Sequence, residues 1–203
     1  MTLLLASASP RRAAILRRMG VEFGVLPVDA DEPRTEDPVE SVVLAALAKH
    51  AAARADARFA GSAALSADTL VSCAGRVLGK PRCEEEALET LALLSGRVHH
   101  VHTAVALSAP GSGAPDVFVE TAAVRFRAFG RDEALAYFRL ARTLDRAGAY
   151  DIDAHGDRLV ERLVGSRSCV MGLPASPVRC WLLANGIPAP RRFDDSFPPA
   201  SGG

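Results

Sequence analysis

Residues 3–12 have the sequence LLLASASPRR, in which a short apolar run leads into two serines, a proline and two arginines. The apolar run predicts a buried strand over residues 3–6, and the pattern after it predicts a helix over residues 10–20. Pro10 suits the first helical position because it has no N–H to leave unpaired, and Ser9 suits the N-cap. A strand end, a helix N-terminus and two guanidinium groups together favour an anion site. The alternative is an ordinary capped helix with two solvated arginines.

The rest of the chain predicts an α/β fold with a mixed, elongated sheet flanked by helices, because strands and helices alternate early and hairpins follow. Further strands are expected over residues 21–28, 63–73, 77–78, 98–107, 117–129 and 158–164. Further helices are expected over residues 38–58, 83–94, 131–141 and 176–185. One domain over residues 1–187 is predicted, followed by a disordered Pro-, Gly- and Ser-rich tail over residues 188–203.

Composition excludes several classes of protein. The chain has 203 residues, of which 49% are hydrophobic, and its 24 Lys and Arg balance 24 Asp and Glu. This neutrality argues against a nucleic-acid-binding protein, which usually carries a basic excess. No apolar run reaches the length of a membrane span and no signal peptide is recognisable, so a cytoplasmic protein is expected. The four cysteines form no C-x-x-C pair, which favours reduced thiols.

Two carboxylates are candidates for chemistry. Asp68 interrupts an apolar strand pattern, and a carboxylate buried there is costly unless it meets a cation or a metal ion. Glu32 lies in an acidic turn that follows the predicted strand over residues 21–28. The two together would suit a magnesium ion that is also bound by phosphate oxygens. A structural ion pair for Asp68 and an ordinary surface turn for Glu32 are the alternatives.

The only two lysines are Lys49, within a predicted helix, and Lys80, in a loop after a predicted hairpin. With Arg11 and Arg12 they would supply positive charge to a polyphosphate. Three histidines lie in the strand predicted over residues 98–107, but no third metal ligand accompanies the two on one face. We therefore favour half-buried histidines with hydroxyl partners over a metal site there.

Several motifs in order resemble the Maf family of nucleoside triphosphate pyrophosphatases. The resemblance covers about residues 3–185 and is carried by SASPRR at residues 7–12, Glu32, Lys49, ADT at 67–69, LGKP at 78–81, LSG at 94–96, His99, DRAGAY at 145–150 and VMGLP at 170–174. It implies a fold similar to that of inosine triphosphate pyrophosphatases, with two lobes around a cleft. It also implies a homodimer and the hydrolysis of a nucleoside triphosphate to the monophosphate and pyrophosphate with Mg²⁺ or Mn²⁺.

The resemblance also implies roles for individual residues. Asp68 would be the catalytic carboxylate and would hold the metal ion together with Glu32. The remaining candidates would bind the substrate, and they are Ser7, Ser9, Arg11, Arg12, Lys49, Thr69, Lys80 and Asp153. This division fits phosphoryl-transfer chemistry, in which positioning and neutralisation of charge supply most of the rate.

The resemblance also bears on the choice of base. In the branch that acts on dTTP and UTP, an arginine, a threonine and a glutamine are linked to the choice of base. Arg12 and Thr69 match, but Asp153 occupies the position of the glutamine. A carboxylate only accepts hydrogen bonds, whereas an amide also donates, so we expect a broadened or shifted base preference. The alternatives are the same reaction on 7-methyl-GTP or other modified nucleotides, and a nucleotide-binding regulator of cell division with weak hydrolysis.

Overall fold

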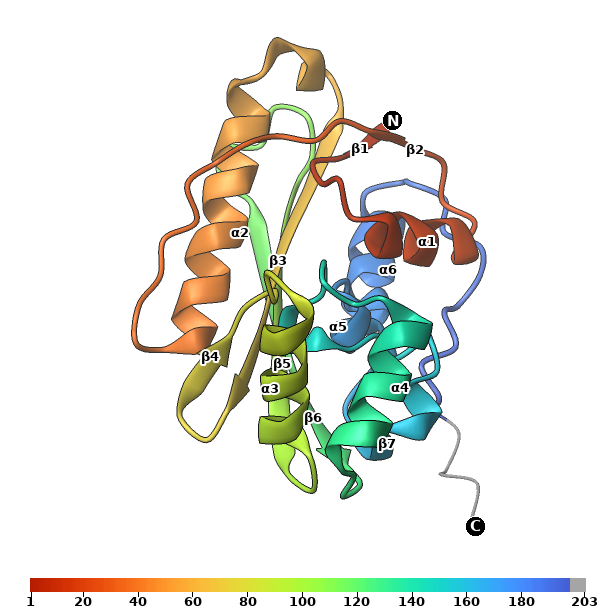
Figure 1. Ribbon diagram of the computed structural model, residues 1–203. Helices are drawn as coiled ribbons and strands as arrows, with labels where there is room; N and C mark the ends of the chain where they lie inside the picture. The colour runs from red at the N-terminus through yellow and green to blue at the C-terminus, as the bar shows by residue number, and fades with distance from the viewer. Residues whose placement is uncertain (198–203) are drawn as a thin grey trace. The chain divides into compact units, whose positions relative to one another are not determined.

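The computed structural model describes residues 1–197 and contains seven strands, six α-helices and three short 3₁₀ helices in that part of the chain (Figure 1). The strands are β1 (Leu3–Leu5), β2 (Phe23–Val25), β3 (Ala63–Cys73), β4 (Arg76–Leu78), β5 (Val98–Ser108), β6 (Asp116–Phe126) and β7 (Val160–Val164). The α-helices are α1 (Pro10–Arg18), α2 (Pro38–Ala55), α3 (Glu84–Leu94), α4 (Arg131–Ala141), α5 (Arg167–Met171) and α6 (Ala175–Ala184). The 3₁₀ helices are η1 (Ala57–Phe59), η2 (Ala147–Ala149) and η3 (Gly156–Arg158).

The seven strands form one mixed sheet, which confirms the predicted fold class. The strand order is β2-β1-β3-β5-β6-β7, and β4 pairs with β3 outside this path. Strand β1 is parallel to both β2 and β3, whereas β4 is antiparallel to β3 and β7 is antiparallel to β6. The parallel pairing explains why the N-terminal strands alternate with helices, since parallel neighbours need crossover connections.

The described chain divides into two compact units, as the expectation of two lobes requires. The first unit comprises residues 1–69, 103–120 and 172–195, and the second comprises residues 70–102, 121–171 and, of the described residues, 196–197. Strands β3, β5 and β6 each contribute one part to each unit. The predicted domain boundary at residue 187 stays a prediction.

Helix α2 covers the first part of β3 in the first unit (Figure 1). Asp37 caps the helix, since its carboxylate accepts a hydrogen bond from the Val39 N–H at 2.7 Å. The Ser66 hydroxyl of β3 donates to the carbonyl of Ala46 at 2.9 Å and so fixes the helix against the strand. This contact positions Lys49, one turn further along α2.

The core of the second unit contains a buried histidine among aromatic rings. His99 has no exposed surface and lies edge-on to the rings of Phe126 and Tyr150. Its Nε2 is 3.0 Å from the Tyr150 hydroxyl, while its Nδ1 has no partner within the described residues. Burial lowers the pKa of His99 to about 3. The ring is therefore neutral and serves as part of the core.

His102 confirms the expectation of hydroxyl partners. Its ring nitrogens lie 2.9 Å from the hydroxyl groups of Ser72 and Thr121. The four cysteines are all free thiols, which agrees with their spacing in the sequence. Within residues 1–197 no helix is long and apolar enough to cross a membrane.

The structure differs from the sequence-based expectations at three places. Strand β2 covers only three of the eight residues predicted over 21–28, because its sole partner β1 is itself three residues long. Helix α5 was not predicted, since five residues are too few to show a helical period. The segment from residue 188, predicted as a tail, begins with ordered contacts: Ala189 is buried and the Arg191 N–H donates to the Met19 carbonyl at 3.1 Å. The rest of this prediction, residues 198–203, lies outside the described residues.

Candidate active site

Asp68 lies inside β3, and its side chain is only 7% exposed. Its Oδ1 accepts a hydrogen bond from Lys49 Nζ at 2.7 Å, and its Oδ2 accepts one from Arg34 Nη1 at 3.1 Å. Two cations therefore offset the cost of burying this carboxylate. Asp68 thus has the cationic partners that its burial requires, an arrangement that the alternative of a structural ion pair also predicts.

Glu32 shares both of these cations with Asp68. Its Oε1 lies 2.6 Å from Lys49 Nζ, and its Oε2 accepts a hydrogen bond from Arg34 Nη2. The two carboxylates and two cations form a closed ring, which we call the charged ring. Glu32 is more exposed than Asp68, at 38% against 7% of the side chain. The ring therefore runs from the interior of β3 to solvent.

Arg12 is buried and forms a second cluster in the same unit. Its Nε donates to the Gly172 carbonyl at 2.9 Å, its Nη1 to Ser7 Oγ at 2.9 Å and its Nη2 to Thr69 Oγ1 at 3.2 Å. Burial lowers the pKa of Arg12 to about 10, although the negative charge of Asp68 opposes this shift. The guanidinium remains charged at neutral pH, and it contacts Thr69, which follows the catalytic candidate Asp68 in β3.

Gly172 is required at its position for two reasons. Its φ of +100° lies in the region that favours glycine, and a Cβ there would lie 3.1 Å from Thr69 Oγ1. Only glycine therefore allows the main-chain carbonyl to reach Arg12 while Thr69 keeps its place. The Thr69 hydroxyl also lies 3.0 Å from that of Thr103 in β5.

Ser9 and Arg11 lie at the start of α1. Ser9 occupies the predicted N-cap position with an extended backbone, although its hydroxyl makes no capping hydrogen bond. The Ser9 N–H donates a hydrogen bond to Ser7 Oγ at 3.2 Å, so the Ser7 side chain faces the turn that precedes α1. Arg11 is half-buried, and the first turn of α1 has no acidic residue. The turn thus keeps the positive character that an anion site needs.

Two predicted residues belong to the second unit. Lys80 is exposed in the loop after β4, next to Gly79, whose carbonyl accepts from the Gly148 N–H at 3.2 Å. Asp153 Oδ1 accepts a hydrogen bond from Arg167 Nε at 2.7 Å. The structure thus brings together Ser7, Arg12, Glu32, Lys49, Asp68 and Thr69 within the first unit.

Comparison with known proteins shows the family to which the chain belongs. The profile described as Maf-like protein matches residues 2–184. The chain belongs to this family. A dTTP/UTP pyrophosphatase of Methylobacillus flagellatus is 38% identical over 94% of this chain and 96% of its own length. The dTTP/UTP pyrophosphatases of Moorella thermoacetica and Myxococcus xanthus are 42% and 41% identical, each over more than nine-tenths of both chains.

The Maf-like family implies a divalent cation, and the charged ring fits one. Within residues 1–197 no group of three or more His, Cys, Asp and Glu side chains is placed to hold a metal ion. The chain offers the two carboxylates of Glu32 and Asp68, whose oxygens converge on the single Nζ of Lys49. Magnesium is commonly held by one or two carboxylates together with substrate phosphates and water, which matches this donor set.

Sequence reasoning missed Arg34 and Arg167. Arg34 follows Glu32 by two residues at the end of the acidic turn, and its sequence position does not indicate the contact with Asp68. Arg167 pairs with Asp153, fourteen residues earlier, and nothing in the local pattern indicates that pairing. Both contacts depend on tertiary structure.

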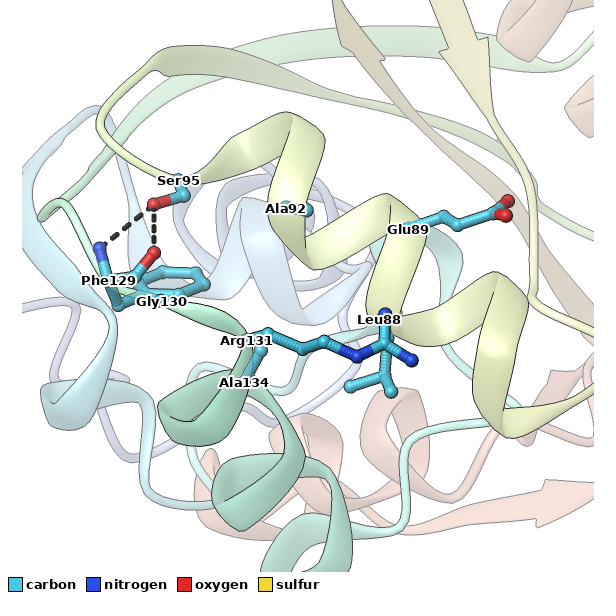
Figure 2. A pocket seen from close by; sticks show the side chains of 8 residues that line it. All are labelled: Leu88, Glu89, Ala92, Ser95, Phe129, Gly130, Arg131 and Ala134. Atoms are coloured by element: carbon cyan, nitrogen blue, oxygen red, sulfur yellow. Dashed lines mark hydrogen bonds between the residues drawn. The ribbon is translucent and has the colours of Figure 1, made fainter.

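A pocket of about 420 Å³ lies in the second unit between α3 and the start of α4 (Figure 2). None of the predicted site residues lines it. Figure 2 shows the Ser95 hydroxyl bound to the main chain of Phe129 at one end of the pocket. Arg131 lies at the other side, and its guanidinium is paired with Glu85. Ser95 and Arg131 are thus both engaged with the protein itself.

Proposed function

We propose that this Maf-like protein hydrolyses a nucleoside triphosphate to the monophosphate and pyrophosphate, as a hydrolase acting on acid anhydrides. The observation that carries the proposal is the buried Asp68 carboxylate, which shares Lys49 with Glu32. The names of relatives that match nearly the whole chain support the same reaction.

Asp68 is proposed as the residue that orients the attacking water and accepts its proton. A carboxylate ion is a hydrogen-bond acceptor only, so it suits a water that must direct its lone pair at phosphorus. Lys49 would hold Asp68 in place and neutralise negative charge that develops on the phosphates. Water adds to one phosphorus, the bridging P–O bond breaks, and its electron pair leaves with pyrophosphate or with the monophosphate, depending on the phosphorus attacked.

Glu32 and Asp68 are proposed to hold a divalent cation, Mg²⁺ or Mn²⁺. When bound, such a cation neutralises phosphate oxygens and lowers the barrier to attack by an anionic or polarised nucleophile. The amides at the start of α1, together with Ser7, Ser9 and Arg11, are proposed to bind phosphate oxygens, and Lys80 is proposed to add a further positive charge.

The base preference is proposed to differ from that of a strict dTTP/UTP enzyme. Arg12 and Thr69 form one connected pair, as that branch requires. Asp153 is paired with Arg167. A carboxylate acceptor and the guanidinium donors therefore lie side by side at the position where the dTTP/UTP branch has the amide of a glutamine. This combination favours a broadened or shifted range of bases, with 7-methyl-GTP among the candidates.

The test is a panel of dTTP, UTP, CTP, GTP, ITP and 7-methyl-GTP with Mg²⁺ or Mn²⁺, with products separated by ion-exchange chromatography. Monophosphate and pyrophosphate in equal amounts are expected, and hydrolysis in ¹⁸O-labelled water locates the phosphorus attacked. Release of the nucleoside diphosphate and inorganic phosphate would contradict the proposal. Absence of hydrolysis of every nucleotide by folded protein would also contradict it. A strict dTTP/UTP profile would contradict the proposed base preference alone.

A homodimer and a cytoplasmic location are also proposed, on the family resemblance. Light scattering coupled to size-exclusion chromatography is expected to give twice the chain mass of 21.4 kDa. A mass equal to that of one chain at micromolar concentration would contradict the dimer.

A further inference from the structure

The charged ring engages every carboxylate oxygen of Glu32 and Asp68 with a cation of the chain itself. Lys49 Nζ binds one oxygen of each carboxylate, at 2.6 and 2.7 Å. The Arg34 guanidinium binds the other oxygen of each, through Nη2 to Glu32 and through Nη1 to Asp68 at 3.1 Å. Two positive charges therefore balance two negative charges.

This balance opposes the entry of a divalent cation. A metal ion is attracted to the pair of carboxylates by their negative charge, and the attraction falls when two internal cations already neutralise them. The same cations would also repel a metal ion placed between them. Tight binding of the metal ion therefore requires that either Lys49 or Arg34 leaves the two carboxylates.

Arg34 is the cation that is free to leave. Its side chain is 41% exposed, against 16% for Lys49, so its guanidinium reaches water by rotation of the side chain alone. It lies in residues 26–37, which form no helix or strand, whereas Lys49 lies within α2. The neighbouring Thr35 N–H is anchored on Ser41 Oγ at 2.8 Å, so the main chain need not move.

We propose that Arg34 is an internal competitor of the divalent cation, which closes the Glu32–Asp68 pair in the metal-free protein and is displaced when the cation binds. The proposal deepens the proposed function and rests on it for the identity of the metal site. It makes Arg34 a positioning residue: it keeps the two carboxylates converged before the cation arrives, and it sets the concentration of cation at which the site fills.

The test is Mn²⁺ binding to the metal-free protein, measured by isothermal titration calorimetry without nucleotide. Arg34→Gln removes the competing charge, and we expect the Mn²⁺ dissociation constant to fall by about twofold to fivefold, the range that a partly exposed ion pair supplies. The matched control is Arg58→Gln, which removes the same charge. Arg58 also pairs with a carboxylate two residues away, that of Asp56. That variant is expected to bind Mn²⁺ like the original protein.

An unchanged or larger dissociation constant in Arg34→Gln would overturn the proposal, and so would equal tightening in both variants, which would indicate a general effect of net charge. Absence of Mn²⁺ binding in all three proteins would also overturn it. Circular dichroism establishes that each variant is folded. The nucleotide panel is a separate measurement, so a failure of hydrolysis with a tightened Mn²⁺ constant would reject the proposed function and leave the competition by Arg34 supported.

Discussion

The stability of the second unit is predicted to fall in mild acid because of His99. The His99 ring has no exposed surface, and burial lowers its pKa from 6.5 to about 3. The unfolded chain therefore takes up a proton at higher pH than the folded protein does. This contribution to stability is complete above pH 6.5 and is lost progressively as the pH falls toward the folded pKa.

The size of the effect follows from the two pKa values. Over the whole range between the two pKa values, the shift changes the free energy of unfolding by about 4 to 5 kcal/mol. Between pH 7 and pH 5 it lowers the free energy of unfolding by about 2 kcal/mol. Burial and the nearby Arg54 also lower the pKa of His50, so that residue acts in the same direction within the first unit.

The assay is urea unfolding at pH 7 and pH 5, followed by circular dichroism, for the original protein and for His99→Gln. The variant cannot titrate, so its loss of stability between the two pH values is expected to be smaller by about 2 kcal/mol. His100→Gln is the matched control, since His100 is the exposed neighbour on the same strand, and it is expected to keep the original pH dependence. An identical pH dependence in His99→Gln and the original protein would refute the reasoning.

Three further predictions concern the site and its surroundings. Thr69→Val removes an acceptor from the buried Arg12 guanidinium, so we expect a loss of about 1.5 to 3 kcal/mol in urea unfolding and a lower rate of hydrolysis; a variant of unchanged stability would contradict this. Gly172→Ala places a Cβ at a φ of +100° and 3.1 Å from Thr69 Oγ1, and we expect a loss of about 1 to 3 kcal/mol, measured in the same way. Arg167→Ala removes the guanidinium from which the Asp153 carboxylate accepts a hydrogen bond, so the ranking of bases in the nucleotide panel is expected to change while the products stay the same; an unaltered ranking would argue against a role of this pair in base choice.

The sequence predicted the parts of the fold whose signals are local. Helix α4 and strand β3 have the bounds that were expected, Arg131–Ala141 and Ala63–Cys73, because each follows its own hydrophobic pattern between clear turn residues. Strand β2 was overestimated, since its length is set by the three residues of its partner and not by its own composition.

Site residues could be predicted from the sequence where a charged residue interrupts an apolar pattern or belongs to a rare residue type. Asp68 stood out for this reason, and Lys49 for being one of two lysines. Arg34 did not, because an exposed arginine in an acidic turn looks like any surface residue until the fold brings it to Asp68. The binding of phosphate by Arg12 stays a prediction, and the contacts of its three nitrogens with acceptors of the protein were not predicted. Only the tertiary structure supplies such contacts.

The most direct test of the central claim is the rate of pyrophosphate release by Asp68→Asn, measured beside the original protein with dTTP, UTP and 7-methyl-GTP. The amide keeps the size of the side chain but removes its negative charge, and we expect kcat to fall by about a hundredfold to ten-thousandfold. Glu86→Gln is the matched control, because Glu86 is an exposed carboxylate paired with Arg82, and it is expected to leave kcat unchanged. A folded Asp68→Asn protein that keeps the original kcat would contradict the account.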